Sequence, residues 1–141
     1  MAVIVLVDDD NRLRASTGTI LRSVGHEVEM AANGRSGLKI IERANPDLIV
    51  TDIVMPELDG LELIRAVRVR NSHIRIVAIS ERARTGNLDY LDLAMKFGAT
   101  DTLRKPFSAA DLRAMAAKPN VHKPSEFWET ALFIESSRAA A

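Results

Sequence analysis

The chain has 141 residues, enough for one domain with a substantial hydrophobic core. Its 19 basic and 19 acidic residues give zero formal net charge, so overall charge provides no general attraction to nucleic acid or an anionic membrane. The absence of cysteine excludes disulfides and thiolate zinc sites and suits a reducing compartment. No apolar stretch reaches membrane-spanning length, and the stretch nearest the N-terminus lacks the features of a signal peptide.

The N-terminal half of the chain alternates short apolar stretches with longer amphipathic ones. The short stretches predict buried strands, and they lie at residues 3–7, 26–30 and 48–51. Between them, apolar side chains at three- and four-residue spacing predict helices over about 12–24 and 34–43. Gly25 and Pro46 follow these two segments and favour the end of each helix.

The C-terminal half continues this alternation after a loop at 52–60 that contains Pro56 and the Asp59–Gly60 turn signal. The same patterns predict helices over 61–70, 88–97 and 109–117, and strands over 74–79 and 100–104. Ser108 is placed to cap the last helix. The polar stretch 81–87 is longer than a tight connection from strand to helix requires.

Five strands alternating with five helices predict an α/β fold, a doubly wound five-stranded parallel sheet with helices on both faces. Residues 1–118 are expected to form this domain, and residues 119–141 a C-terminal extension. Pro119 and Pro124 interrupt the pattern there, and 125–137 predict a short additional helix. Its apolar side chains favour packing on the domain or a homodimer contact, while a linker to an output domain remains an alternative.

Polar residues capable of chemistry follow four of the predicted strands directly. They are Asp8 and Asp9, Asp52, Ser80 and Lys105. Ligands of open parallel sheets bind beyond the carboxyl ends of the strands, so these side chains are expected to converge on one site. Each residue alone has an ordinary structural explanation as a loop, turn or surface residue. Together, the ordered set indicates three carboxylates, a hydroxyl and an ammonium around one small pocket.

Over residues 2–118 the chain resembles the receiver domain of two-component response regulators. The resemblance rests on Asp8–Asp9, on Asp52 within TDIVMPELDG, on Ser80, and on Lys105 before Pro–Phe. It implies a flavodoxin-like, CheY-like fold in the cytoplasm. It also implies that Asp52 accepts a phosphoryl group from a histidine kinase or a histidine phosphotransfer protein. The domain would signal by conformational change to a downstream protein target or output domain, and would assist only its own phosphorylation and dephosphorylation.

The resemblance also assigns the remaining groups of the site. Mg²⁺ would be held by Asp8, Asp9, Asp52 and the backbone carbonyl of Val54, because this cation prefers oxygen ligands. Ser80 and Lys105 would bind oxygens of the phosphoryl group. In the family the peptide bond of this lysine to proline is commonly cis. Without a metal, the three carboxylates are expected to raise one another's pKa values.

Three features depart from the family pattern. Glu81 occupies a position that is usually small, which predicts slow phosphorylation by small donors such as acetyl phosphate. Thr102 stands where a switch aromatic is usual, so another part of the surface would carry the output, with Tyr90 as one candidate. The extra length near 82–87 reshapes the region before the fourth helix. An apolar Val54 also predicts slow loss of the phosphoryl group, because it cannot orient water.

Other functions fit the sequence less well. A receiver-like interaction module that is never phosphorylated agrees with Glu81 and Thr102, but not with the complete set of acidic and basic residues. A haloacid-dehalogenase-like phosphohydrolase would usually have a second aspartate where Val54 stands. A nucleotide-binding fold would have a glycine-rich loop after the first strand. No basic patch or helix-turn-helix segment supports direct nucleic-acid contact, and nothing supports a membrane contact.

Overall fold

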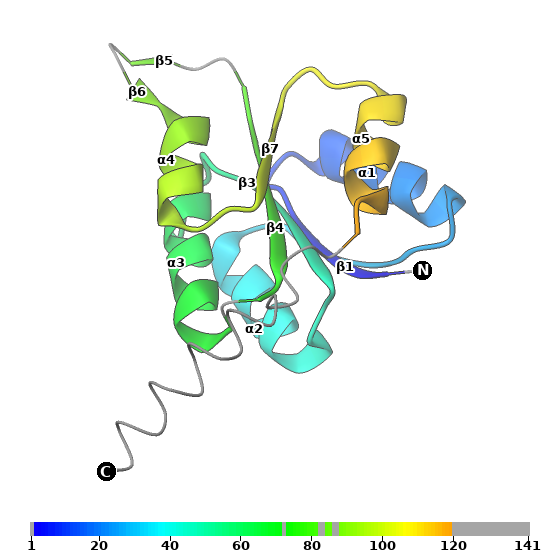
Figure 1. Ribbon diagram of the computed structural model, residues 1–141, viewed down its shortest axis with the longest axis horizontal. Helices are drawn as coiled ribbons and strands as arrows, with labels where there is room; N and C mark the ends of the chain where they lie inside the picture. Colours follow the sequence, from blue (N-terminus) through cyan, green and yellow to red (C-terminus); the bar gives the residue numbers. More distant parts are fainter. Residues whose placement is uncertain (1, 72, 82–83, 86–87, 120–141) are drawn as a thin grey trace.

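The computed structural model describes residues 2–71, 73–81, 84–85 and 88–119, and shows a parallel sheet between two layers of helices (Figure 1). In chain order the elements are β1 Val3–Val7, α1 Asn11–Ser23, β2 Glu27–Ala31, α2 Gly34–Ala44, β3 Leu48–Asp52, α3 Gly60–Arg70, β4 Arg75–Ser80, β5 Arg84–Thr85, β6 Leu88–Asp89, α4 Tyr90–Phe97, β7 Asp101–Arg104 and α5 Ala109–Ala117.

The main sheet has the strand order β2-β1-β3-β4-β7, and every neighbouring pair is parallel. The chain moves from β1 to one side to form β2 and to the other side to form β3, β4 and β7. The strand order therefore reverses between β1 and β3, where open α/β sheets form their ligand crevice. The predicted doubly wound parallel sheet is confirmed.

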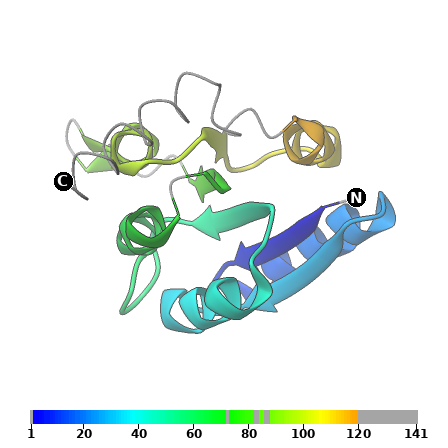
Figure 2. The same ribbon diagram turned by 60° about the horizontal axis from the view of Figure 1, so that its bottom comes forward.

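Helices cover both faces of the sheet (Figure 2). Successive side chains of each strand point to opposite faces, and the two faces form separate hydrophobic cores. Val5 and Val7 belong to the core covered by α2, α3 and α4. Ile4 and Leu6 belong to the core covered by α1 and α5. Because both of their faces are buried, the central strands β1, β3 and β4 are mainly apolar, whereas the edge strand β2 alternates exposed glutamates with buried residues.

Each of the five helices within the described residues begins at a polar cap whose side chain accepts a backbone N–H of the first turn. The capping residues are Asp10, Asn33, Asp59, Asp89 and Ser108. At α5 the cap is reciprocal, because Asp111 also accepts the backbone N–H of Ser108. Of the helices the structure describes, none has both the length and the apolar character needed to cross a bilayer.

The largest difference from the predicted elements lies between β4 and α4. The predicted helix 88–97 begins two residues later, since Leu88–Asp89 forms strand β6 and pairs antiparallel with β5. Asp89 ends this strand and caps α4, its carboxylate accepting the Leu91 N–H at 3.0 Å. The spacing of apolar residues predicted a helix start at residue 88, because it does not distinguish the capping residue Asp89 from the first turn of the helix. The helix predicted at 125–137 lies outside the described residues.

Candidate functional site

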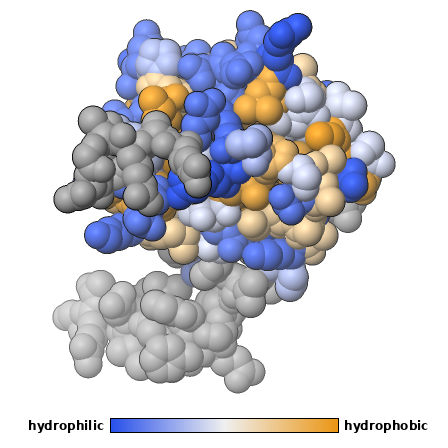
Figure 3. All heavy atoms as spheres, turned by 90° about the horizontal axis from the view of Figure 1, so that it is seen from above, coloured by the Kyte–Doolittle hydropathy of each residue, from blue (hydrophilic) through white to orange (hydrophobic). Residues whose placement is uncertain are grey.

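The carboxyl ends of β1, β3, β4 and β7 border a pocket of about 410 Å³. Its lining residues follow β1, β3, β4 and β7, and they are Asp9, Asp10, Asp52, Val54, Ser80, Glu81 and Lys105. Figure 3 shows the molecule from above relative to the view of Figure 1, and hydrophilic and hydrophobic residues are interspersed on the surface that it shows. The structure therefore brings together the residues that the sequence placed at separate strand ends.

Three carboxylates form the acidic part of the site. One oxygen each from Asp8, Asp9 and Asp52 can be chosen so that all lie within 4.8 Å of one another. Asp8 is 3% exposed and Asp52 is 8% exposed, whereas Asp9 is exposed. A cluster of hard oxygen donors with access to solvent is the kind of site that suits Mg²⁺, which keeps several water ligands in proteins.

Asp8 is held by backbone and side-chain contacts on both sides. Its N–H donates to Ala31 O at 3.1 Å, which extends the pairing of β1 with β2 by one residue. Its carboxylate Oδ1 accepts the Asp10 N–H at 2.9 Å. The Arg14 guanidinium donates to the Asp8 carbonyl at 2.8 Å. These contacts fix the turn from β1 into α1. Asp8 Oδ2 lies 3.6 Å from Lys105 Nζ, while Asp10 caps the helix and also lines the pocket.

Asp52 is the last residue of β3, and the backbone at Gly60, the first residue of α3, packs closely against it. Its Oδ1 accepts the Ile53 N–H at 2.9 Å. A Cβ atom placed on Gly60 would lie 2.2 Å from the Asp52 carbonyl oxygen, closer than any side chain can approach. Glycine at position 60 therefore lets α3 begin directly against the backbone of Asp52.

Lys105 connects two of the carboxylates. Its Nζ lies 3.3 Å from Asp52 Oδ2 and 3.6 Å from Asp8 Oδ2, and its side chain is 10% exposed. The Lys105 N–H donates to Ser80 O at 2.9 Å, which ties the end of β7 to the end of β4. The Lys105–Pro106 peptide bond is cis, as the family resemblance implied.

Burial makes the charged state of the two inner carboxylates unfavourable. It raises the pKa of Asp52 from 3.8 to about 6, with Lys105 opposing this shift and Asp8 adding to it. Burial also raises the pKa of Asp8, against a backbone hydrogen bond and Lys105. Repulsion between carboxylates was expected to be the cause of raised pKa values, but burial contributes more. Lys105 supplies one positive charge to a site with three carboxylates, so negative charge remains in excess.

Glu81 lies at the rim of the pocket, as the sequence predicted. It is exposed, and it lines both the acidic pocket and a groove beside Lys105 that is formed by Leu13, Pro106 and Phe107. The effect of Glu81 on phosphoryl donors stays a prediction.

The two positions considered for the output lie on the edge strand β7 and at the start of α4. Thr102 is half-buried on β7. Tyr90 is half-buried at the start of α4 and packs against the core under α2, α3 and α4. A role for Tyr90 in place of the missing aromatic also stays a prediction.

The sequence did not reveal two of the residues that support the site. Gly60 was predicted only as part of a turn, since a glycine after aspartate gives no sign of what its backbone will touch. Arg14 was not predicted, because its contact with the Asp8 carbonyl depends on how α1 leaves β1. Asp8 and Arg14 are six residues apart in the sequence. This spacing indicates a contact only where the first residue stands at the end of a strand and the second lies in the helix that follows.

Comparison with known proteins identifies the family. The model of the response regulator receiver domain matches residues 4–117. The transcriptional regulatory protein AfsQ1 of Streptomyces coelicolor is 34% identical over 114 residues, which cover 81% of this chain and 49% of AfsQ1. Sporulation initiation phosphotransferase F of Bacillus subtilis is 29% identical over 115 residues, covering 82% of this chain and 90% of that protein.

Solved structures agree with these relatives. A response regulator receiver domain from Clostridium thermocellum has a TM-score of 0.73 at 34% identity and covers 81% of this chain and 90% of its own. The Vibrio cholerae chemotaxis protein CheY4 has a TM-score of 0.74 at 30% identity, and the match covers 82% of this chain and 96% of the CheY4 chain. This chain spans about half the length of AfsQ1 and of the similar MprA proteins. On this fold, these strand-end residues and these matches, the chain belongs to the receiver-domain family of two-component response regulators.

Proposed function

We propose that Asp52 is the phosphoacceptor of this receiver domain. The observation that carries the proposal is the position of Asp52, a buried carboxylate at a strand end, 3.3 Å from Lys105 and close to two further carboxylates. In the reaction an Asp52 oxygen attacks the phosphorus of a phosphohistidine and the P–N bond breaks. The histidine nitrogen takes up a proton from solvent, and an acyl phosphate remains on Asp52.

Asp8, Asp9, Asp52 and the backbone carbonyl of Val54 are the groups proposed to hold Mg²⁺. Their oxygens fit this cation, and Val54 lies at the pocket beside Asp52. When bound, Mg²⁺ supplies positive charge that offsets repulsion between the carboxylates and an incoming phosphate. Asp8 and Asp52 gain most from that charge, because they are the buried members of the cluster.

Lys105 and Ser80 are proposed to bind the phosphoryl group itself. The Lys105 ammonium already lies 3.3 Å from Asp52 Oδ2, next to the carboxylate to which a phosphoryl group would be attached. Ser80, at the end of β4, can donate its hydroxyl hydrogen to another phosphoryl oxygen. A better fit of these two groups to phosphate in one conformation than in another would shift the population toward that conformation.

The donor is proposed to be a histidine kinase or a histidine phosphotransfer protein, in the cytoplasm. The output would be contact with a protein partner or an attached domain, since AfsQ1 and MprA extend well beyond the matched region. A receiver-like interaction module without phosphorylation is the second candidate. Glu81 at the pocket rim and Thr102 on β7 favour it.

Intact-mass measurement after incubation with acetyl phosphate or phosphoramidate tests the proposal. We expect the mass of one phosphoryl group to be added to the full chain with Mg²⁺, and none to Asp52→Asn or without Mg²⁺. Asp92→Asn, an exposed carboxylate on α4, is the matched control and should behave as wild type. Equal labelling of Asp52→Asn would overturn the assignment. No labelling of wild type, together with no beryllofluoride binding by ¹⁹F NMR, would favour the unphosphorylated module.

A further inference from the structure

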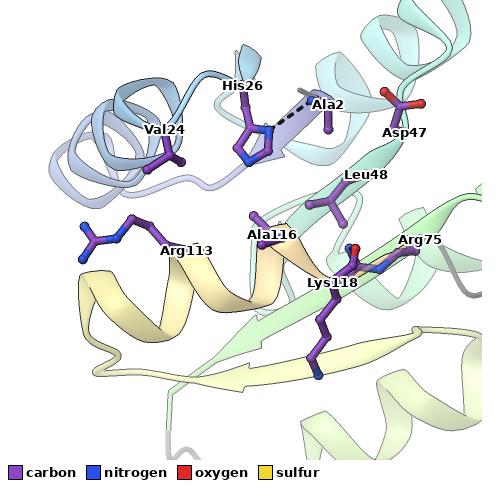
Figure 4. A pocket seen from close by; sticks show the side chains of 10 residues that line it. Ala2, Val24, His26, Asp47, Leu48, Arg75, Arg113, Ala116 and Lys118 are labelled. Atoms are coloured by element: carbon purple, nitrogen blue, oxygen red, sulfur yellow. Dashed lines mark hydrogen bonds between the residues drawn. The ribbon is translucent and has the colours of Figure 1, made fainter.

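A second pocket, of about 650 Å³, lies at the opposite end of the sheet from Asp52 (Figure 4). It is formed where α1 ends, where β1 and β3 begin, and along the last turn of α5. Val24, Leu48 and Ala116 give it an apolar lining, and Val24 is 47% exposed. Its volume is typical of pockets that enclose ligands or side chains. The proposed phosphorylation chemistry does not use it.

The rim of this pocket is cationic. Arg113 is exposed and makes no hydrogen bond or ion pair within the described part of the chain. Lys118, just after the same helix, also lines the pocket, but its ammonium pairs with Asp101 at 3.4 Å. The pocket has one carboxylate, Asp47, whose Oδ2 accepts the Val3 N–H at 2.8 Å. An apolar lining with a surplus of positive charge fits an apolar segment that carries acidic residues.

Arg75 fixes the place where the chain leaves α5. This arginine is the first residue of β4 and only 3% exposed. Its guanidinium donates to the Lys118 carbonyl at 2.9 Å and to the Met115 carbonyl at 2.8 Å, and lies 3.6 Å from Asp101. The end of α5 is therefore held against the sheet, and Lys118, which lines the pocket, is followed by Pro119 and residues 120–141.

The sequence that follows has the matching chemistry. Residues 125–137 contain Glu126, Glu129 and Glu135 and no lysine or arginine. Their large apolar side chains are Phe127, Trp128, Leu132, Phe133 and Ile134. Phe127 and Ile134 are seven residues apart, which places them on one face if the segment is helical. The linker 120–124 spans up to about 17 Å when extended, so the segment can return to the pocket it starts beside.

We propose that residues 125–137 of the same chain dock in this pocket, with apolar side chains against Val24, Leu48 and Ala116 and glutamates toward Arg113. The short linker keeps the segment close to the pocket at a high effective concentration, which a separate partner lacks. The docked segment covers the amino ends of the strands and leaves the Asp52 pocket open. The C-terminal extension is thus a part of the domain rather than a free surface for partners.

Trp128 tests this proposal directly, because it is the only tryptophan of the chain. We expect Trp128 in wild type to have blue-shifted emission and to be protected from acrylamide quenching. Ala117→Glu adds a carboxylate at an exposed position of the pocket lining and should increase the quenching constant about threefold or more. Ala114→Glu makes the same change at an exposed position of α5 outside the pocket, and should leave it unchanged.

Arg113→Glu provides an independent variant and should also expose Trp128, and far-UV circular dichroism establishes that each variant is folded. Equally strong quenching in wild type and both pocket variants would overturn the proposal, because the segment would be undocked. Protection that neither pocket variant changes would place the segment elsewhere and overturn it too. Protection that is lost on dilution, with a matching dimer-to-monomer change in sedimentation, would assign the contact to a second copy of the chain and also overturn it.

Discussion

The two ends of strand β4 carry two buried clusters of charge that differ in balance. At its carboxyl end, Ser80 adjoins a site where Lys105 faces the carboxylates of Asp8 and Asp52, with Asp9 nearby. At its amino end, the Arg75 guanidinium is bound by two carbonyls of the α5 end and lies 3.6 Å from Asp101. Lys118 also contacts Asp101, at 3.4 Å.

The difference lies in the balance between positive and negative charge. At the amino end Arg75 carries the one buried side-chain nitrogen or oxygen of the described residues without a hydrogen-bond partner, its Nε, but its other guanidinium nitrogens are bound. Positive charge there meets carbonyl and carboxylate oxygens. At the carboxyl end, negative charge exceeds positive charge, and burial raises the pKa of Asp52 to about 6. One cluster is arranged for stability, whereas the other is under strain that a cation or a proton relieves.

Arg75→Met should have the largest effect on stability. The substitution removes both hydrogen bonds to the carbonyls at the end of α5 and one of the two cations that contact Asp101. It leaves the two partly buried carbonyl oxygens without the guanidinium donors. We expect the free energy of unfolding to fall by about 3 kcal/mol. Urea denaturation followed by circular dichroism measures this change. Arg35→Met, an exposed arginine on α2, is the control and should change stability by less than about 0.5 kcal/mol.

A loss of less than about 1 kcal/mol in Arg75→Met would mean that water replaces the guanidinium at little cost. The amino-end cluster would then be no more structural than an ordinary surface ion pair.

Asp52→Asn should have the opposite sign and stabilise the metal-free protein. The folded pKa of Asp52 is about 6 and the ordinary value is 3.8, so the folded state holds this proton more tightly than the unfolded state. Wild type therefore loses stability as the pH rises from about 4 to about 6, and the loss is complete above that range. Asparagine carries no charge, so at about pH 8 the variant should be more stable by about 2–3 kcal/mol.

Urea denaturation in EDTA at about pH 4 and about pH 8 measures this difference between Asp52→Asn and wild type. The gain should be present at the higher pH and nearly absent at the lower one. A gain of the same size at both pH values would assign it to packing rather than to the charge of Asp52. Asp92→Asn, the exposed control on α4, should show neither effect.

Mg²⁺ should produce a smaller stabilisation that is confined to the carboxyl end. At a concentration about tenfold above the dissociation constant, a ligand that binds only the folded state adds about 1.4 kcal/mol to the free energy of unfolding. We expect such an increase in wild type, and its loss in Asp9→Asn, because Asp9 is the exposed member of the carboxylate cluster. Arg75→Met should keep the full increase, and a parallel loss there would show that the two clusters are coupled.

The residues of the carboxyl-end site could be predicted because a simple rule governs them. A parallel strand that ends on a polar residue presents that residue at a shared edge, and this holds for Asp8, Asp52, Ser80 and Lys105 without knowledge of packing. The helix cap at Ser108 was predictable for a different reason, because capping depends on only a few neighbouring residues.

Other features depend on contacts between distant segments, and the sequence pattern did not reveal them. Arg75 binds carbonyls of residues 40 and 43 positions further along the chain, so its burial follows only from the packing of α5. The raised pKa of Asp52 was expected from repulsion but comes mainly from burial, which local sequence does not report. The β5–β6 pair replaced a predicted loop and helix start, because a two-residue strand has no detectable period.

Glu81 adds a further negative charge to the carboxyl end, and removing it should have the smallest effect. The carboxylate is exposed at the pocket rim beside Lys105, where we expect it to repel a phosphate donor that approaches Asp52. We expect Glu81→Ala to accelerate labelling by acetyl phosphate about threefold at low salt, with less gain at high salt, where charges are screened. Glu81→Gln should match it if charge rather than size limits access, and Glu62→Gln, an exposed glutamate on α3, should have no effect. Equal rates in Glu81→Ala and wild type would show that this rim carboxylate does not control entry to the site.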